Sequence, residues 1–430
     1  MTKLFDTQFN KEKAILVTIS VPQQEHSGWS PEDAALELRE LVNSSARALI
    51  IDEVVARIDK PTANFFIGTG KTEEIHQLCH TQNEEIDVII FSENLSSTQQ
   101  RNLEEAIGVR IIDRTQLILD IFAQRAHSIE GKLQVELAQL QYLKPRLMGK
   151  GVMLSRLSAG LGTRGPGENK LEVDRRNINK RISKIKEDLN ALKSVRSQRQ
   201  SARKEHSIST VALIGYTNAG KSTLLNALTE AGVPADERLF TTLDTTSRKF
   251  VLPNHQKILF IDTVGFLHNL PHNLIEAFKA TLEEAVQADL LLQVTDVSNP
   301  KVNELMDSVY SVLKEIEAEK KPMILVLNKI DKAANDYEIA RLKKKTNDSV
   351  AISALKNEGL EDLVAMITDK FSTLLTDIDV LIPYDNMKLV NMLYTEGDII
   401  KRQDTSKGIR IKARVPARIK EQIPYKIKNS

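Results

Sequence analysis

The sequence contains a single cysteine, Cys79, so no disulfide can form within the chain and no multi-cysteine metal site can be built. Aromatic residues make up only 5% of the 430 residues. The longest apolar runs, such as residues 290–292, are far shorter than a membrane span requires. The first residues show no apolar run of signal-peptide length. We therefore expect a folded, cytoplasmic protein without a transmembrane segment.

Net charge is also nearly absent, because 59 Lys and Arg residues stand against 58 Asp and Glu residues. This balance hides two basic stretches. Residues 141–210 hold 17 basic and 6 acidic residues, and residues 401–430 hold 10 basic and 2 acidic residues. Two basic regions on an otherwise acidic body indicate a polyanionic partner.

The N-terminal region, residues 1–128, alternates short apolar runs with polar, helix-like stretches. We expect buried strands at residues 14–17, 48–51, 88–91 and 109–112, separated by helices near residues 31–42, 72–80 and 97–107. This strand–helix alternation predicts an α/β domain with a small parallel sheet.

Residues 129–207 are predicted to form an antiparallel helical hairpin, because apolar residues recur at heptad spacing on two arms. These positions are Leu133, Leu137, Leu140 and Leu147 on the first arm and Leu171, Ile178, Ile182, Ile185, Leu189 and Leu192 on the second. An alternative is that both helices pack on a domain core, but the basic outer faces favour a projecting hairpin. The loop between the arms, residues 148–169, holds six of the 18 glycines and three basic residues, a composition suited to ordering against RNA.

Residues 208–373 again alternate predicted strands and helices, and they contain several well-defined sequence motifs. A buried strand at residues 210–214 leads into a P-loop and then into a helix, as phosphate binding requires. The P-loop residues are Gly215, Tyr216, Thr217, Asn218, Ala219, Gly220, Lys221 and Ser222. We expect Lys221 to bridge the β- and γ-phosphates and the Ser222 hydroxyl to bind Mg²⁺.

A second strand ends in Asp262, Thr263, Val264 and Gly265, 40 residues after Ser222. Asp262 is placed to hold Mg²⁺ directly or through water, and the amide of Gly265 can sense the γ-phosphate.

A third motif, Asn328, Lys329, Ile330 and Asp331, follows the strand at residues 323–327. The Asp331 carboxylate can accept from the N1–H and N2–H₂ groups of guanine, donors that adenine lacks. Ser353, Ala354 and Leu355 follow another strand and are predicted to bring a backbone N–H near guanine O6. Together these motifs predict a GTP/GDP site with Mg²⁺.

The loop between the first two motifs contains Phe240, Thr241, Thr242, Leu243 and Asp244. A threonine here can ligate Mg²⁺ only while the γ-phosphate is present, so the loop would order with GTP. The pattern alone does not choose between Thr241, Thr242, Thr245 and Thr246.

Phe266 stands where many GTPases carry the glutamine that orients the attacking water. We therefore expect that the protein alone hydrolyses GTP slowly and that an activator is needed for faster hydrolysis. The candidate helpers are a monovalent cation such as K⁺ near Asn218 and an external partner that orders the loops.

The sequence resembles the HflX-type ribosome-associated GTPases over nearly its whole length. The glycine-rich stretch at residues 161–168, the residues 171–176 that follow it, and the P-loop with residues 240–244 and 262–266 carry this resemblance. It implies a P-loop GTPase that binds the large ribosomal subunit and its RNA, splits or rescues stalled ribosomes, and directs the hairpin tip toward the peptidyl-transferase region. It also points to Thr242 as the Mg²⁺-binding switch threonine, which with Lys221 and Gly265 completes the expected catalytic set, and it implies a weaker ATPase activity.

The expected fold is therefore α/β, with a GTPase domain at residues 208–373 and a small C-terminal α+β domain at 376–430. In this last part, residues 409–415 alternate apolar and basic, which predicts a strand with one positive face. We expect a protein that binds no DNA and is monomeric away from the ribosome. The alternatives are a GTPase in RNA modification or remodelling, for which no separate catalytic residues stand out, and a non-enzymatic GTP-sensing regulator.

Overall fold

A computed structural model of the chain describes residues 11–21, 29–81, 84–156, 166–205, 208–229, 239–240, 246–254, 256–267, 271, 283–333, 335–344, 346–372, 375–416, 419–420 and 423. The chain divides into two compact units. Unit 1 comprises residues 1–194, 236–244 and 269–279, and unit 2 comprises residues 195–235, 245–268 and 280–430.

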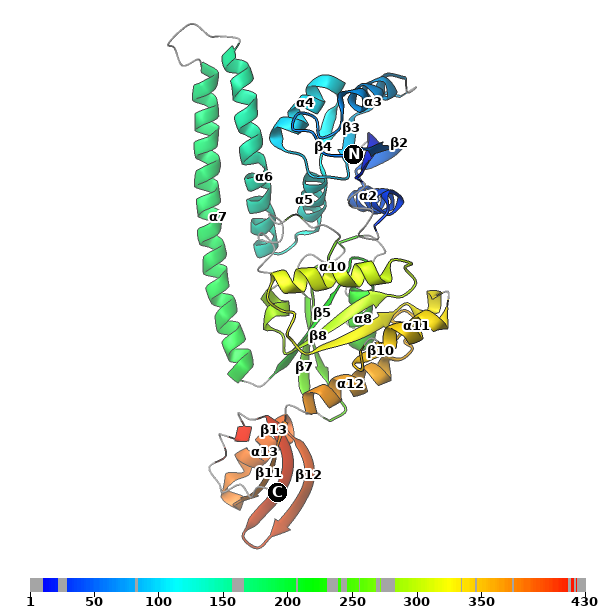
Figure 1. The fold of residues 1–430 in the computed structure, drawn as a ribbon. Coiled ribbons are helices and arrows are strands. Elements are labelled where there is room, and N and C mark those ends of the chain that lie inside the picture. The colour runs from blue at the N-terminus through cyan, green and yellow to red at the C-terminus, as the bar shows by residue number, and fades with distance from the viewer. Residues whose placement is uncertain are drawn as a thin grey trace, which may run out of the picture. The chain divides into compact units, whose positions relative to one another are not determined.

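Unit 1 contains a four-stranded parallel sheet in the order β2-β1-β3-β4 (Figure 1). Its elements are β1 (Glu12–Ser20), α2 (Pro31–Ser45), β2 (Ala48–Arg57), α3 (Thr69–Thr81), β3 (Val88–Phe91), α4 (Ser97–Ile107), β4 (Arg110–Ile112) and α5 (Arg114–Arg125). Buried residues of β1 and β3, such as Ile15, Val17 and Phe91, pack with Leu103 and Ile107 of α4. The α/β alternation predicted for this region is confirmed.

Two helices of this sheet domain begin at capping boxes. Ser30 accepts from the backbone N–H of Asp33, whose carboxylate accepts in return from the N–H of Ser30. Ser96 and Gln99 form the same reciprocal pair at the start of α4. These side chains satisfy backbone donors that a helix start leaves without partners, so the local sequence sets both starting points.

The helical hairpin consists of α6 (Ile129–Arg156) and α7 (Pro166–Glu205), which lie side by side in Figure 1. The structure narrows the glycine-rich loop predicted at 148–169. Residues 148–156 continue α6, and residues 166–169 begin α7 with Pro166 as the first helical residue. A glycine disfavours a helix by only about 1 kcal/mol, so continuation of a long helix overrides it. Residues 157–165 lie outside the described part of the chain.

The predicted apolar seam is confirmed where its side chains are described. Leu137 and Ile185 are buried, and the partly buried seam residues are Leu133, Leu140, Leu147, Ile178, Ile182, Leu189 and Leu192. The side chain of Leu171 lies outside the described residues. Arg181 of α7 donates two hydrogen bonds, of 2.6 and 2.7 Å, to Glu136 of α6. The two arms are thus joined by an apolar seam with an ion pair at its edge.

A buried polar clamp fastens α6 to the sheet domain. Asp113, which caps the N-terminus of α5 and is fully buried, accepts from the Tyr142 hydroxyl at 2.8 Å and from Arg146 at 2.9 Å. Its carboxylate also accepts from the backbone N–H groups of Gln116 and Leu95. Burial raises the pKa of Asp113, although these donors and the Arg146 charge act to lower it. Because the bonds from Tyr142 and Arg146 join α6 to a buried carboxylate of the sheet domain, the clamp fixes the first arm on this domain.

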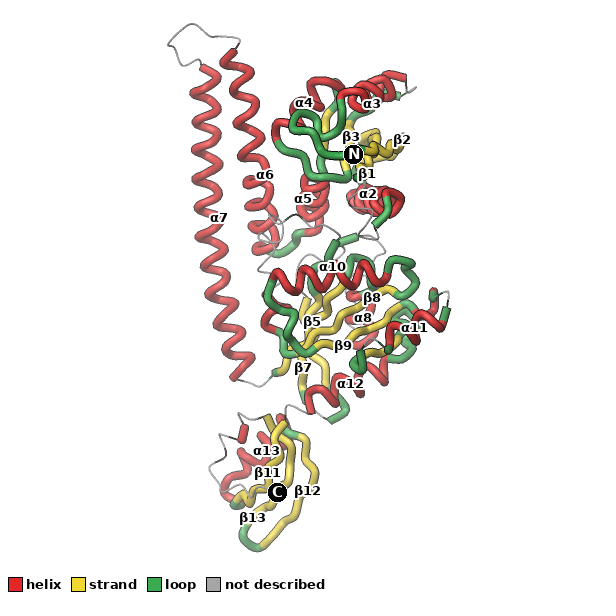
Figure 2. The backbone as a smooth tube through the Cα atoms, viewed as in Figure 1, coloured by secondary structure: helices red, strands yellow, loops and turns green. Residues whose placement is uncertain are grey.

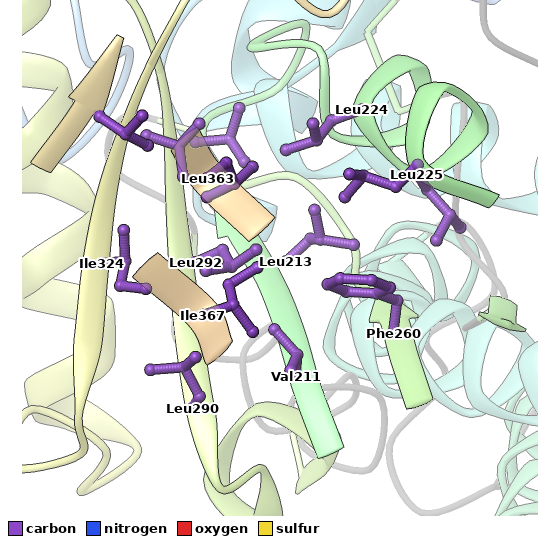
Figure 3. Close-up of a cluster of buried hydrophobic side chains, with 14 of the residues drawn as sticks. Val211, Leu213, Leu224, Leu225, Phe260, Leu290, Leu292, Ile324, Leu363 and Ile367 are labelled. Atoms are coloured by element: carbon purple, nitrogen blue, oxygen red, sulfur yellow. The ribbon is translucent and has the colours of Figure 1, made fainter. Parts of the chain in front are cut away.

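Unit 2 contains a six-stranded sheet in the order β10-β9-β8-β5-β7-β6, parallel except for the edge strand β6. Its elements are β5 (Ser209–Gly215), α8 (Lys221–Thr229), β6 (Thr246–Val251), β7 (Lys257–Asp262), β8 (Leu290–Asp296), α10 (Val302–Glu315), β9 (Met323–Asn328), a 3₁₀ turn (Ile330–Lys332), α11 (Asp336–Lys343), β10 (Ser349–Ala351) and α12 (Leu360–Ser372). Leu213, Phe260 and Leu292 of the sheet pack with Leu225 of α8 and Ile367 of α12 (Figure 3). A second cluster, which includes Val302, Leu327 and Leu342, covers the other face.

The C-terminal part folds as β11 (Leu375–Ile382), α13 (Met387–Glu396), β12 (Asp398–Thr405) and β13 (Gly408–Pro416), with the sheet order β11-β13-β12. The α+β prediction is confirmed, but the basic face of β13 differs from expectation. Arg410 pairs with Asp379 at 2.7 Å, and Arg414 lies 3.4 Å from Asp377, both on the neighbouring strand β11. Acidic cross-strand partners therefore offset much of the predicted positive face.

The strands gather into three separate sheets, which Figure 2 distinguishes by colour from the helices around them. Among the described residues, no helix is both long and apolar enough to span a membrane.

Candidate nucleotide-binding site

The predicted phosphate and base motifs, apart from the loop at 240–244, lie at the carboxyl ends of strands in the sheet of unit 2. β5 ends at Gly215, β7 at Asp262 and β9 at Asn328, and Ser353 follows β10. The carboxyl edge of a parallel sheet is where α/β proteins bind their ligands. The fold thus brings together residues that are up to 138 positions apart in the chain.

The P-loop requires glycine at its last turn. Gly220 has a φ of +93°, and a Cβ added there would overlap the side-chain amide of Asn328. Asn328 is buried, donates to the carbonyl of Ala219 at 2.8 Å, and accepts from the N–H of Ala354 at 3.0 Å. It therefore ties the P-loop to the Ser353–Leu355 segment. The predicted contact between this segment and guanine O6 stays a prediction, because the Ala354 amide is engaged here with Asn328.

Lys221, at the first position of α8, is buried with its ammonium group folded back on the P-loop. Its Nζ donates to the carbonyls of Gly215 at 3.2 Å and Tyr216 at 2.9 Å. Burial lowers the pKa of Lys221 to about 8, against a smaller raising effect of Asp262. A buried ammonium held by two carbonyl dipoles is suited to receive an anionic phosphate.

The side-chain oxygen atoms of Ser222 and Asp262 lie next to each other. The Ser222 hydroxyl donates to Asp262 Oδ2 at 2.7 Å, and the Asp262 side chain is fully buried. A hydroxyl and a carboxylate are the hard oxygen donors that Mg²⁺ prefers. The donor chemistry of this pair therefore fits the predicted metal.

The segment after Asp262 lies directly on the P-loop. The N–H of Thr217 donates to the carbonyl of Phe266 at 2.8 Å, and the N–H of Phe266 donates to the carbonyl of Gly215 at 3.0 Å. A Cβ on Gly265 would lie 2.8 Å from Thr217 Cα and 2.9 Å from Lys221 Nζ, so only glycine allows this approach. The Phe266 side chain is buried and has no polar group that could orient a water.

The predicted base-binding residues also meet. The Ser353 hydroxyl donates to Asp331 at 2.6 Å, and this hydrogen bond is the main reason why the pKa of Asp331 lies below its usual range. Lys329 has a left-handed backbone with a φ of 65°, and its Nζ lies 2.8 Å from Asp296. Asp331 thus stays ionised, as acceptance from guanine N–H groups requires.

Asp296 is a residue that the motif search missed. It ends β8 and holds Lys329, so it positions the lysine that is predicted to pack along the base. Its only signal in the sequence is an aspartate after an apolar strand, which is too common to be specific. Conversely, Thr263 is turned away from the site, because its hydroxyl donates to the carbonyl of Leu213 at 2.7 Å.

The predicted switch loop is described only in part. Thr241, Thr242, Leu243 and Asp244 lie outside the described residues, and so does Thr245. Leu239 and Phe240 are described, are buried, and belong to unit 1.

Four family models match consecutive stretches of the chain. Their descriptions are GTP-binding GTPase N-terminal (residues 32–123), GTP-binding GTPase Middle Region (125–203), 50S ribosome-binding GTPase (210–329) and HflX C-terminal domain (338–428). The chain is 45% identical over 415 residues to GTPase HflX of Caldanaerobacter subterraneus, which covers 96% of this chain and 93% of that protein. It is 39% identical over 416 residues to GTPase HflX of Escherichia coli, which covers 96% of each chain.

The chain belongs to the HflX family of GTPases. As an HflX-family protein it binds GTP and GDP and hydrolyses GTP. Among solved structures it is similar to a GTP-binding protein from Sulfolobus solfataricus in complex with GDP. That structure is 26% identical, has a TM-score of 0.44, and covers 84% of this chain and 99% of its own.

The family assignment agrees with the resemblance carried by the glycine-rich stretch and the P-loop. In the HflX-family chain, the predicted phosphate, metal and base motifs occupy one edge of one sheet, where Ser222 bonds to Asp262 and Lys221 lies against Gly265.

Proposed function

We propose that this HflX-family GTPase is a GTP-controlled factor that binds the RNA of the large ribosomal subunit in the cytosol and splits or rescues stalled ribosomes. The observation that carries the proposal is a guanine-nucleotide site joined, in one chain, to a helical hairpin with a large excess of basic residues. The match of residues 210–329 to a family model described as 50S ribosome-binding GTPase supports the choice of partner.

The P-loop residues take the role of phosphate cradle. The backbone N–H groups at the start of α8 and the helix dipole favour the phosphate anions. On binding, the ammonium group of Lys221 exchanges the carbonyls of Gly215 and Tyr216 for the β- and γ-phosphates. Ser222, Asp262 and Thr242 would hold Mg²⁺, which when bound neutralises charge on the phosphates. The Gly265 amide would then meet the γ-phosphate.

Guanine selectivity is assigned to Asp331, with Lys329 along the ring and Asn328 as the support between the loops. Leu355 is 71% exposed beside the buried Ala354, so its side chain is available to cover a bound base. A site built to accept from guanine donors disfavours adenine, because adenine offers the Asp331 carboxylate no such pair of donors.

Hydrolysis by the free protein is proposed to be slow. Phe266 is buried and bonded through its backbone to the P-loop, and its apolar side chain cannot orient an attacking water. The ribosome and a K⁺ ion beside the exposed Asn218 are the proposed helpers.

Co-sedimentation with purified large ribosomal subunits tests this proposal. We expect at least tenfold tighter association with a non-hydrolysable GTP analogue than with GDP, and a steep loss of association with added salt, because phosphate contacts release counterions. Lys221→Ala, which removes the phosphate-binding ammonium group, should bind equally weakly with either nucleotide. Equal co-sedimentation of the wild-type protein with the analogue and with GDP would contradict the proposal.

A further inference from the structure

Thr217 stands in the middle of the P-loop, but the backbone cradle for phosphate gives its side chain no role. The residue is only 5% exposed. Its hydroxyl oxygen is buried, and among the described residues it has no hydrogen-bond partner. Buried hydroxyl groups are nearly always hydrogen-bonded, so this exception needs an explanation, and contact with a bound ligand is one.

The backbone N–H of Thr217 is already engaged within the protein. It donates to the carbonyl of Phe266 at 2.8 Å, next to the parallel bridge that pairs Tyr216 with Phe266. A threonine has two hydrogen-bond donors, the backbone N–H and the side-chain hydroxyl. Since the first is bonded to the segment after Asp262, the hydroxyl is the donor that Thr217 can offer to a bound phosphate.

The Thr217 side chain lies beside the two groups that are assigned to the γ-phosphate, Lys221 and Gly265. A Cβ added to Gly265 would lie 2.8 Å from Cγ2, the methyl carbon of Thr217, and 2.9 Å from Lys221 Nζ. The methyl group and the hydroxyl of a threonine share one Cβ, and β-branched side chains are stiff about the bond to it. The hydroxyl is therefore held close to the same two groups.

We propose that the Thr217 hydroxyl is an additional ligand of the γ-phosphate and raises the affinity for GTP relative to GDP. When the Lys221 ammonium group moves from the carbonyls of Gly215 and Tyr216 to the phosphates, a γ-phosphate oxygen between Lys221 and Gly265 lies next to Thr217. A hydrogen bond to a charged phosphate is stronger than one between neutral groups. GDP lacks this oxygen, so only GTP gains the bond. The inference rests on the nucleotide site of the proposed function.

Three substitutions separate the hydroxyl from the rest of the side chain. Thr217→Val replaces the hydroxyl by a methyl group and keeps the branched shape that packs on Gly265. Thr217→Ser keeps the hydroxyl and removes the methyl group. Thr263→Val is the matched control, because Thr263 is also buried but its hydroxyl donates to the carbonyl of Leu213 at 2.7 Å.

Equilibrium titrations of the full-length protein with GDP and with the non-hydrolysable analogue GMPPNP, both with Mg²⁺, test the inference. In Thr217→Val, we expect the affinity for GMPPNP to fall about tenfold and the affinity for GDP to change less than about twofold, because one hydrogen bond to a charged group is lost from GMPPNP alone. Thr217→Ser and Thr263→Val should keep the wild-type ratio of the two affinities within about twofold, since both retain the Thr217 donor or its serine equivalent. Binding of GDP also verifies that each variant is folded.

The outcomes distinguish a phosphate contact from a structural role of the side chain. Equal losses for both nucleotides in Thr217→Val would show that the side chain only supports the shape of the P-loop, and unchanged affinities would show that the γ-phosphate does not meet the hydroxyl. Either result overturns the inference, and so does a Thr217→Ser variant that shifts the ratio as much as Thr217→Val. Because these titrations contain no ribosome, their failure leaves the proposed ribosomal role intact, and failure of co-sedimentation leaves the phosphate contact intact.

Discussion

At the scale of single residues, Lys221 shows how the site is prepared for its ligand at the expense of stability. Its ammonium group is buried against two carbonyl groups, and burial lowers its pKa from the ordinary 10.5 to about 8. A folded-state pKa below the unfolded value means that the charged form destabilises the folded protein. Bound phosphate reverses this effect, because an anion stabilises the same charge.

We expect Lys221→Met to stabilise the nucleotide-free protein at pH 7, by up to about 3 kcal/mol, since one pKa unit corresponds to about 1.4 kcal/mol. The destabilisation by Lys221 is fully present below pH 8 and fades as the pH rises toward 10.5, where the unfolded chain also loses the proton. The stabilisation by methionine should therefore shrink over the same range.

Scanning calorimetry measures this effect on the transition that added GDP shifts upward in the wild-type protein. The exposed Lys320, when changed to Met, provides the control and should leave that transition unchanged. A Lys221→Met variant whose transition temperature equals that of the wild-type protein at pH 7 would show that the buried charge is well compensated.

At the scale of elements, two arginines on the hairpin differ sharply in their surroundings. Arg146 of α6 is 17% exposed and pairs with the buried Asp113, whereas Arg181 of α7 is 44% exposed and pairs with the half-exposed Glu136. Removing one partner of a buried pair leaves an uncompensated charge, which costs about 3–5 kcal/mol. Breaking an exposed pair costs about 1 kcal/mol or less, because water replaces the lost contact.

We therefore expect Arg146→Ala to lower the free energy of unfolding of the N-terminal unit by about 3 kcal/mol, and Arg181→Ala by less than about 1 kcal/mol. Trp29, the only tryptophan in the chain, lies in this unit and reports its urea unfolding by fluorescence. Similar losses for the two variants would mean that the clamp at Asp113 does not anchor the first arm of the hairpin.

Elements and motifs could be predicted from the sequence wherever the signal is local. The apolar run before Gly215 and the heptad spacing of the hairpin are signals of this kind, each contained in one strand or helix. Contacts across large sequence distances left no such signal. Examples are the pairing of Arg410 with Asp379 and the packing of Phe240 on Phe122. The predicted loop at 148–169 includes residues at both ends that are helical in the structure, 148–156 and 166–169. Glycine disfavours a helix only weakly, so its content alone does not mark where a long helix ends.

At the scale of the whole molecule, the chain carries the phosphate, metal and base motifs of a GTPase but lacks one residue that many GTPases use in hydrolysis. The phosphate, metal and base motifs gather at one sheet edge, but the position that orients water in many GTPases holds the buried Phe266. The proposed slow hydrolysis would keep GTP bound until a partner orders the groups that position the attacking water. Under the proposed function, the two basic stretches of the sequence would bind ribosomal RNA, and binding to the ribosome would be coupled to hydrolysis.

GTP turnover measured in four conditions, with and without large ribosomal subunits and in K⁺ or Na⁺, tests this coupling. We expect subunits to raise kcat at least tenfold, because they order loops that the free protein leaves incomplete for catalysis. We expect K⁺ to raise it several-fold over Na⁺, with the advantage lost in Asn218→Ala, since the amide oxygen is the proposed cation ligand. Turnover by the free protein that matches turnover with subunits would place the full catalytic machinery within this chain, and a K⁺ effect that persists in Asn218→Ala would place the cation elsewhere.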